Sequence, residues 1–365
     1  MVNPKQFTRS EIERHSVDIR QFIDFRQSTL SNGMRIIEAY NSSGLTFTIL
    51  PDRGLDIWTA HYKGVPLTWI SQGSPHLPDH GQGWLRQFNG GLLTTCGLTH
   101  VGPAERDEIS GEQRDIHGMY SLLRAGEISV DRHWYGETDY SAWLNGQISH
   151  SRLFGEQLLL RRSYGLELGH PTITIWDTVT NLGDTPAPFM LLYHFNLGYP
   201  LIGDGTRLHA PSADVYPRDS AAKQGYARWW EYSKAIPQYA EQVFFHRLKA
   251  RPNGFTRVMV GNSDIAVALD WDTAGLPYFT QWKNTRNGIY VSGIEPGNCI
   301  PEGQNAARRH NRLIFLAPGQ EYRSAISLTV LDGADAIRES WGNINQLQDL
   351  GTATSLCMLN AIDYA

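Results

Sequence analysis

The chain has 365 residues, of which 41% are hydrophobic and 19% are charged, so it can bury a large core and widespread disorder is not expected. The formal net charge is −5 and no segment is dominated by Lys or Arg, which argues against a nucleic-acid-binding protein. No run of 18 apolar residues exists and the N-terminal segment is polar, so we expect neither a membrane span nor a signal peptide. The three widely spaced cysteines predict no disulfide framework, and we expect a cytoplasmic location.

The first 30 residues predict a short helical N-terminal extension. Within it, residues 10–22 could hold one or two helical turns. Ser10 is the expected N-cap, and Glu13 stands at the capping-box position three residues later.

Strand signals dominate after this extension. Short runs of alternating, β-branched or aromatic residues are separated by Gly, Pro, Asn and Asp, as is typical of antiparallel sheets. The expected strands are residues 45–50, 64–70, 90–97, 156–164, 172–180, 189–196, 264–269, 278–282, 288–294, 313–316 and 322–330.

This pattern predicts an all-β protein, built as a large antiparallel β-sandwich. Strands and helices do not alternate as they would in a doubly wound fold. Residues 334–341 favour a helix, and the chain after them looks irregular. Because no linker or fixed-period repeat is found, we expect a single domain over residues 1–365.

Aromatic residues are abundant, with 11 Trp and 16 Tyr. Flat aromatic faces can pack against the C–H faces of sugars while hydroxyl groups bind polar side chains at the rim. Large β proteins also use aromatic residues to fill their cores, so composition alone leaves both interpretations open.

Two residues are candidate catalytic groups because each stands at the expected end of an apolar strand. His194 precedes a Gly-Tyr-Pro loop, and its side chain titrates near neutral pH. Glu295 precedes Pro296, which should keep Glu295 extended and make the chain turn next. The alternatives are a structural histidine bonded to backbone and a structural salt bridge from Glu295 to Arg308 or Arg312.

Five further residues are candidate substrate ligands. His117 lies in an Ile-His-Gly segment, where the glycine allows a close bend, although a structural histidine fits equally well. The other four are Arg53, Arg86, Gln281 and Lys283. Side chains of these types more often serve solvation or structure than ligand binding.

The sequence gives little reason to expect a metal or an organic cofactor. His76 and His80 have the i, i+4 spacing of two metal ligands on a helix, but Pro75 and Pro78 disfavour that helix. Dinucleotide-binding, P-loop and GxSxG motifs are missing. We therefore predict no metal site and no cofactor.

Several of these segments resemble the galactose mutarotase (aldose 1-epimerase) superfamily. The stretch 179–198 is similar to the family's strand, turn and strand that carry the catalytic histidine. Residues 293–296 (Gly-Ile-Glu-Pro) resemble the late strand with the catalytic glutamate, and residues 116–118 resemble its substrate-binding His-Gly. Residues 51–57, 90–98 and 295–298 look more like a bacterial branch of the superfamily, the DUF4432 group.

The resemblance implies a β-supersandwich fold with His194 and Glu295 as acid and base and with His117 at the substrate. One feature departs from the family. Its Asn-Arg-Ile arginine has no counterpart at residues 94–98, and Arg86 or Arg53 would have to replace it.

The expected reaction interconverts the anomers of an aldose or modified sugar by ring opening. Glu295 would act as base and His194 as acid, with the two groups roughly 5–7 Å apart. Two alternatives stay open: a non-catalytic carbohydrate-binding protein, and a cupin-like metal-dependent sugar isomerase using His76, His80 and a carboxylate. The expected partner is a small sugar, without nucleic acid or membrane, and the sequence leaves a homodimer open.

Overall fold

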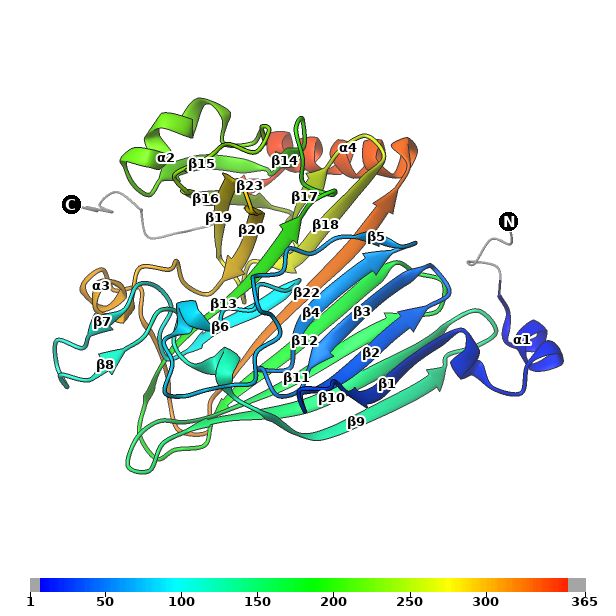
Figure 1. Cartoon of the computed structure of the whole chain (residues 1–365), viewed down its shortest axis with the longest axis horizontal. Helices are drawn as coiled ribbons and strands as arrows, with labels where there is room; N and C mark the ends of the chain where they lie inside the picture. Colours follow the sequence, from blue (N-terminus) through cyan, green and yellow to red (C-terminus); the bar gives the residue numbers. More distant parts are fainter. Residues whose placement is uncertain (1–6, 354–365) are drawn as a thin grey trace.

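The computed structural model describes residues 7–353, and antiparallel sheets make up most of their regular secondary structure (Figure 1). One sheet has five strands in sequential order. They are β1 (Ile23–Thr29), β2 (Arg35–Asn41), β3 (Leu45–Leu50), β4 (Asp56–Tyr62) and β5 (Val65–Pro66).

A second, long sheet has eight strands in the order β14-β17-β18-β22-β12-β11-β10-β9. They are β9 (Ala125–Trp134), β10 (Tyr140–Ser151), β11 (Gln157–Glu167), β12 (Thr172–Asn181), β14 (Arg207–His209), β17 (Phe255–Gly261), β18 (Ile265–Asp272) and β22 (Glu321–Asp332).

The third sheet, here called the site sheet, has the order β15-β16-β19-β20-β13-β21, with β6 also paired to β13 and β23 to β16. Its strands are β6 (Leu93–Leu98), β13 (Ala187–Gly198), β15 (Ser212–Pro217), β16 (Gln242–Ala250), β19 (Tyr278–Arg286), β20 (Ile289–Gly297), β21 (Ile314–Leu316) and β23 (Thr352–Ala353). A small hairpin of β7 (Glu105–Arg106) and β8 (Gln113–Arg114) stands apart.

Helices are short and lie between or beside the sheets. They are α1 (Arg9–His15), α2 (Ser220–Gly225), α3 (Gln304–Arg309) and α4 (Ala334–Leu350), with 3-10 turns η2 (Ile19–Gln21), η3 (Trp84–Arg86), η4 (Tyr120–Leu122) and η5 (Tyr226–Arg228). None of the helices within residues 7–353 is long and apolar enough to cross a membrane.

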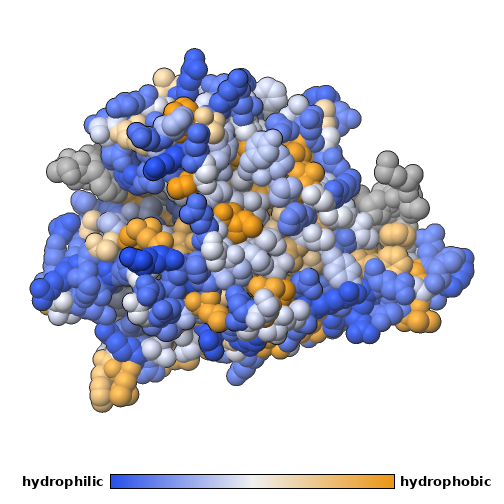
Figure 2. Space-filling model, in the orientation of Figure 1, coloured by the Kyte–Doolittle hydropathy of each residue, from blue (hydrophilic) through white to orange (hydrophobic). Residues whose placement is uncertain are grey.

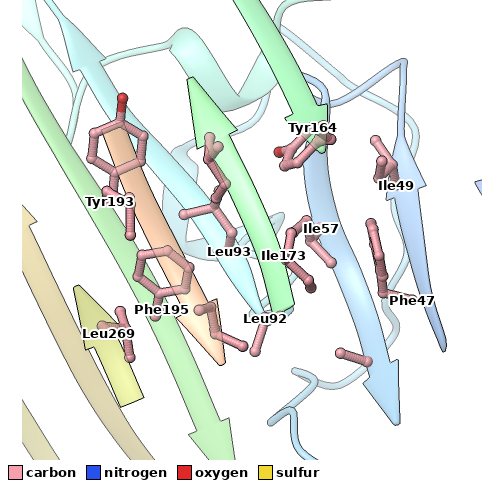
Figure 3. Packing of buried hydrophobic residues seen from close by; sticks show 14 of the residues in the cluster. Phe47, Ile49, Ile57, Leu92, Leu93, Tyr164, Ile173, Tyr193, Phe195 and Leu269 are labelled. Atoms are coloured by element: carbon pink, nitrogen blue, oxygen red, sulfur yellow. The ribbon is translucent and has the colours of Figure 1, made fainter. Parts of the chain in front are cut away.

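One continuous core joins the three large sheets. Strand β12 shows how: alternate residues such as Ile173, Ile175 and Val179 are buried, while the threonines between them face outward. These side chains meet Phe195 of β13 and Phe47 of β3 (Figure 3). Burying a phenylalanine such as Phe195 completely stabilises the fold by roughly 1.5–3 kcal/mol. On the face drawn in Figure 2, hydrophobic residues form separate patches among hydrophilic ones.

The structure confirms the all-β class and most of the expected strands. The strand expected at 64–70 is wrong, since only Val65–Pro66 pair as a strand and Thr68 and Ile70 form single bridges to other segments. The long strands β9, β10 and β16 were missing from the expected set.

Both ends of the chain need correction. The helix α1 is capped by Thr8, whose capping-box partner is Glu11, rather than by Ser10 and Glu13. The N-terminal extension is also not helical throughout, because Ile23–Thr29 pair with β2. At the other end, α4 continues to Leu350: Ile344 packs on Met259, Ala266 and Ala268 of the long sheet, and Leu347 is also buried.

Candidate functional site

His194 and Glu295 meet on one face of the site sheet. The register of β13 and β20 pairs Leu192 with Gly297 and Phe195 with Ile294, which places His194 opposite Glu295. Their side chains touch, with His194 Nε2 3.1 Å from Glu295 Oε1. Two residues separated by about 100 positions are therefore joined by strand pairing alone.

Two details differ from expectation. Both residues lie inside their strands rather than at the ends, since β13 continues to Gly198 and β20 through Pro296 to Gly297. Proline keeps an extended backbone here without making the chain turn. The separation is also smaller than the expected 5–7 Å, because facing positions of paired strands bring side chains into direct contact.

The pair is buried, and burial shifts both pKa values toward the uncharged forms. His194 is 6% exposed and Glu295 is 3% exposed. Burial lowers the pKa of His194 to about 4. Burial, with a smaller contribution from the Glu241 carboxylate and an opposing one from Arg218, raises the pKa of Glu295 well above its ordinary value. Two buried groups that exchange one proton suit acid–base chemistry.

Glycine 293 makes room for the pair. A Cβ at this position would collide with Glu295 Oε1 and lie 3.1 Å from His194 Cε1. The side chain of Trp282, which is opposite Gly293 on β19, would also be too close at 2.8 Å. Any larger residue here would displace the candidate catalytic groups.

His117 lies beside the pair on a tight turn. Its backbone has φ of +57° and that of Gly118 has φ of +72°, both in the left-handed region. A non-glycine residue held there marks a locally strained position of the type found at functional sites. The His117 ring lies 6.2 Å from the His194 ring, and its buried Nδ1 has no hydrogen-bond partner among residues 7–353. Burial, reinforced by the nearby His194 and His100, lowers the pKa of His117 to about 3.

Aromatic rings surround His194 and form the walls of the site. Phe88 and Trp282 lie edge-on to His194, with ring centroids 5.9 and 5.4 Å away. Trp84 stacks on Phe88 at 4.4 Å and also contacts His117 at 5.0 Å. Trp69 lies between Phe88 and Trp282, and its ring contacts both of them. Trp69, Phe88 and Trp282 are partly exposed, so this aromatic cluster extends from the buried pair toward the surface.

The two candidate arginines take different positions. Arg53 is buried and donates hydrogen bonds to the carbonyl oxygens of Gln87 (2.7 Å) and His76 (3.4 Å), so it holds the loop that carries η3. Burial lowers the pKa of Arg53 to about 10. Arg86 is exposed on η3, two residues after Trp84. Arg53 therefore stabilises the loop that carries Trp84 and Phe88, while Arg86 lies on η3 together with Trp84.

Gln281 and Lys283 do not join the other candidates. They flank Trp282 on β19 and point to the opposite face of the site sheet, where Gln281 is register partner of the core residue Ile294. Gln281 Nε2 donates to the Trp229 carbonyl and the Tyr232 hydroxyl. Lys283 Nζ donates to the carbonyl oxygens of Arg228 and Glu231. Alternation along the strand separates both side chains from His194 and Glu295.

The remaining alternatives for these residues can also be compared with the structure. Arg308 pairs with Asp107 and Arg312 with Glu302, so neither forms the salt bridge considered for Glu295. Within residues 7–353, no three His, Cys, Asp or Glu side chains are grouped to hold a metal ion. His76 and His80 therefore belong to no such group of three ligands in this part of the chain.

Sequence reasoning missed the wall residues. Trp282 lies between Gln281 and Lys283, which were predicted as ligands in its place. Strand alternation alone puts Trp282 on the other face from these two residues. Trp69, Trp84 and Phe88 come from an irregular segment, and their only signal was the high aromatic content. Glu241, whose Oε2 accepts the indole N–H of Trp282 at 2.8 Å, carried no signal.

Comparisons with solved structures agree with this fold. A candidate aldose 1-epimerase from Klebsiella pneumoniae is 26% identical, with a TM-score of 0.84, covering 90% of this chain and 88% of that one. A galactose mutarotase-like protein from Clostridium acetobutylicum has a TM-score of 0.63 at 14% identity, covering 86% and 99% of the two chains. A galactose 1-epimerase from Lactobacillus acidophilus has a TM-score of 0.56 at 13% identity, covering 85% of this chain and 99% of that one.

A search of curated proteins gives no match. The family model described as a domain of unknown function, DUF4432, matches residues 31–330, which include every residue of the site. The chain therefore belongs to the DUF4432 family, on a galactose mutarotase-like fold.

Proposed function

We propose that the protein is an aldose 1-epimerase-like isomerase that interconverts the anomers of an aldose or a modified sugar. The observation that carries the proposal is the buried contact of 3.1 Å between His194 Nε2 and Glu295 Oε1 on one face of the site sheet. The similarity to structures described as aldose and galactose 1-epimerases supports the same reaction class.

The reaction transfers two protons at one carbon atom. Glu295 removes the proton from the anomeric hydroxyl, O1, while His194 donates a proton to the ring oxygen, O5. The C1–O5 bond breaks as C1=O1 forms, giving the open aldehyde. Rotation about C1–C2 presents the other face of the aldehyde, and the reverse proton transfers close the ring as the opposite anomer.

The environment of the pair favours this exchange. In the ring-opening step a carboxylate and an imidazolium become a carboxylic acid and a neutral imidazole, so the pair holds one proton throughout. Burial lowers the pKa of His194 and raises that of Glu295, which stabilises the neutral forms produced when the ring opens. Both oxygens that react are bonded to C1, so two catalytic atoms that lie close together can reach them.

The surrounding side chains suit a pyranose. Trp69, Phe88 and Trp282 offer partly exposed aromatic surfaces for the C–H faces of the ring. His117 Nδ1 is free to bind a sugar hydroxyl. The described residues perform the proposed steps with side-chain acids and bases alone.

The Glu295→Gln variant tests the proposal. Glutamine keeps the shape and the hydrogen bonding of glutamate but cannot act as a base. Anomer exchange would be measured by NMR saturation exchange over a panel of aldoses, uronates, phosphosugars and sulfosugars, with the spontaneous rate subtracted. We expect wild type to accelerate at least one of them, and the variant to lose about 10²–10⁴-fold in kcat.

Binding by the same variant separates an enzyme from a binding protein. Sugar affinity in Glu295→Gln should stay within about threefold of wild type, since the remaining contacts are unchanged. Equal exchange rates for wild type and variant would contradict the assignment of Glu295 as base. Sugar binding without any exchange by wild type would identify a carbohydrate-binding protein instead.

A further inference from the structure

A groove of about 640 Å³ lies at the β15 edge of the site sheet, away from the strands that carry His194 and Glu295. Its walls come from β14, β15, η5, the two residues after η5, and α4 (Figure 1). Strand β14 is an edge strand of the long sheet and β15 is one of the site sheet, so the groove opens where the edges of the two sheets meet. Pockets of roughly 300–1,000 Å³ are typical of small-molecule sites.

Aromatic side chains form much of the surface of this groove. Trp229 and Trp230 follow η5, and their rings stand nearly at right angles, with an interplanar angle of 86° and centroids 5.6 Å apart. Tyr216 of β15 and Tyr226 of η5 also line it. Trp230 is 38% exposed and Tyr226 is 47% exposed. Large aromatic residues that gather at one exposed place mark an interaction site, and their flat faces suit the C–H faces of a sugar.

Polar groups line the same groove beside the aromatic rings. Asn345 and Gln348 are three residues apart on α4, so their amides lie on one side of the helix, and each amide can both donate and accept. Arg207 of β14 adds further donors. The hydroxyl groups of a sugar can pair with all of these side chains, whereas an apolar ligand would leave them without partners.

Buried polar side chains hold the aromatic wall in place from the core side. Gln281 Nε2 donates to the Trp229 carbonyl at 3.0 Å, and Lys283 Nζ donates to two carbonyl oxygens of the same segment. The His246 ring packs edge-on against Trp229 at 4.8 Å, and its Nδ1 is 2.9 Å from the Ser212 hydroxyl. A wall that is already ordered loses little conformational freedom when a ligand binds.

We propose that this groove is a second, non-catalytic carbohydrate-binding site. A saccharide stacks on Trp230 and exchanges hydrogen bonds with the amides of Asn345 and Gln348. Gln281, which holds Trp229, points to the opposite face of β19 from Trp282, so the groove lies behind the catalytic face and can be occupied at the same time. The inference goes beyond the proposed function, because binding here requires no proton transfer.

The test uses the full chain labelled with fluorotryptophan, whose fluorine NMR resonances report on single tryptophans. Resonances of Trp229, Trp230 and Trp282 are assigned with Trp→Phe variants, so the groove and the catalytic face are observed separately. Titration with glucose, galactose, maltose and cellobiose should shift the Trp230 resonance in a saturable way for at least one sugar. Trp230→Ala should weaken this binding at least about tenfold, as observed by the Trp229 resonance.

Two further variants serve as comparisons. Trp176→Ala removes another exposed tryptophan, on the outer face of the long sheet, and should leave binding in the groove unchanged. Asn345→Ala, at an exposed position of α4, should weaken it about threefold or more through the lost hydrogen bond. Thermal unfolding shows that each variant is folded at the temperature of the titration.

The inference is overturned if none of the four sugars shifts the Trp230 resonance, or if Trp230→Ala and Trp176→Ala bind them alike. It is also overturned if adenosine monophosphate shifts this resonance and no sugar does, because the groove would then recognise a planar base and a phosphate. Failure of the proposed function is a separate result: it would appear as missing anomer exchange, whatever the response of Trp230.

Discussion

Tyr193 and His194 are neighbours on β13, and their side chains enter two very different buried polar clusters. On the core side, the Tyr193 hydroxyl contacts Asp177 (2.6 Å) and Ser324 (2.7 Å). On the other side, His194 contacts Glu295 within the aromatic walls. The two faces of one strand thus allow a structural polar network to be compared with a candidate catalytic pair.

The core network contains its own cation and is fully connected. Arg162, which is completely buried, binds Asp177 through two nitrogens (2.9 and 2.7 Å) and Asp56 through a third (3.0 Å). Asp56 also accepts hydrogen bonds from the backbone and hydroxyl of Thr95. Such saturation fixes the positions of every group and leaves nothing to bind a ligand.

Among residues 7–353, no arginine forms a salt bridge with Glu295 of the candidate catalytic pair, and the neighbouring His117 keeps an unpaired Nδ1. The difference teaches that burial alone does not indicate function in this protein. Burial also raises the pKa of Asp56 in the core network to about 6, so the feature that separates the candidate pair from this network is incomplete hydrogen bonding, at His194 Nδ1 and His117 Nδ1.

The largest effect is expected from a substitution that breaks the core network. Arg162→Met leaves Asp56 and Asp177 buried without their cation, and we expect a loss of about 3–5 kcal/mol in the free energy of unfolding. Arg162→Lys keeps a charge and should lose less. Denaturant unfolding followed by circular dichroism measures both. A loss under about 1 kcal/mol for Arg162→Met would mean that the network contributes little to the fold.

Substitutions on the two faces of β19 should have different, smaller effects on KM. Trp282→Phe removes the hydrogen bond to Glu241 and part of the wall, and we expect KM for the substrate to rise about three- to tenfold, equivalent to roughly 1 kcal/mol. Lys283→Met, one residue further on the opposite face, should leave KM within about twofold of wild type.

Steady-state kinetics on the sugar of the panel that wild type interconverts fastest would measure both variants. A large increase in KM for Lys283→Met would contradict the structure and restore Lys283 as a substrate ligand. Thermal unfolding of both proteins serves as the control that each is folded at the assay temperature.

The sequence predicts the individual strands better than it predicts the site. Alternation of residues located β3 and β12 almost to the residue, because that signal is local. The same alternation could have separated Trp282 from Gln281 and Lys283. It could not show that Trp282 faces Glu295, because the register between β19 and β20 is set by contacts throughout the sheet.

His194 and Glu295 could be singled out from their own segments and from the family resemblance, yet their separation could not. Strand pairing determines it, and pairing is a property of residues far apart in the chain. Glu241 lies just before β16 in a segment without periodicity, so only its contacts with Arg218 and Trp282 reveal its position.

The smallest expected change is the pH dependence of the reaction, which contrasts the buried pair with free groups. An exposed histidine would gain a proton near pH 6.5. Burial lowers the pKa of His194 to about 4, so the pair gains its second proton only in that lower range. We therefore expect kcat/KM, corrected for spontaneous exchange, not to fall as the pH decreases from 7.5 to 5.5. A fall of tenfold across this interval would show that His194 titrates like an exposed histidine.

The stability of the folded protein sets the lowest pH at which kcat/KM can be measured. His194 and His246 are buried and His117 is half-buried, and burial lowers the pKa values of His117, His194 and His246 to about 3, 4 and 3. Between pH 6.5 and pH 4 the unfolded chain binds protons at these positions and the folded chain does not, so stability falls as the pH falls. Glu295 acts oppositely, since its raised pKa loses stability as the pH rises above about 4.5. Circular dichroism at each pH would distinguish unfolding from titration of the site.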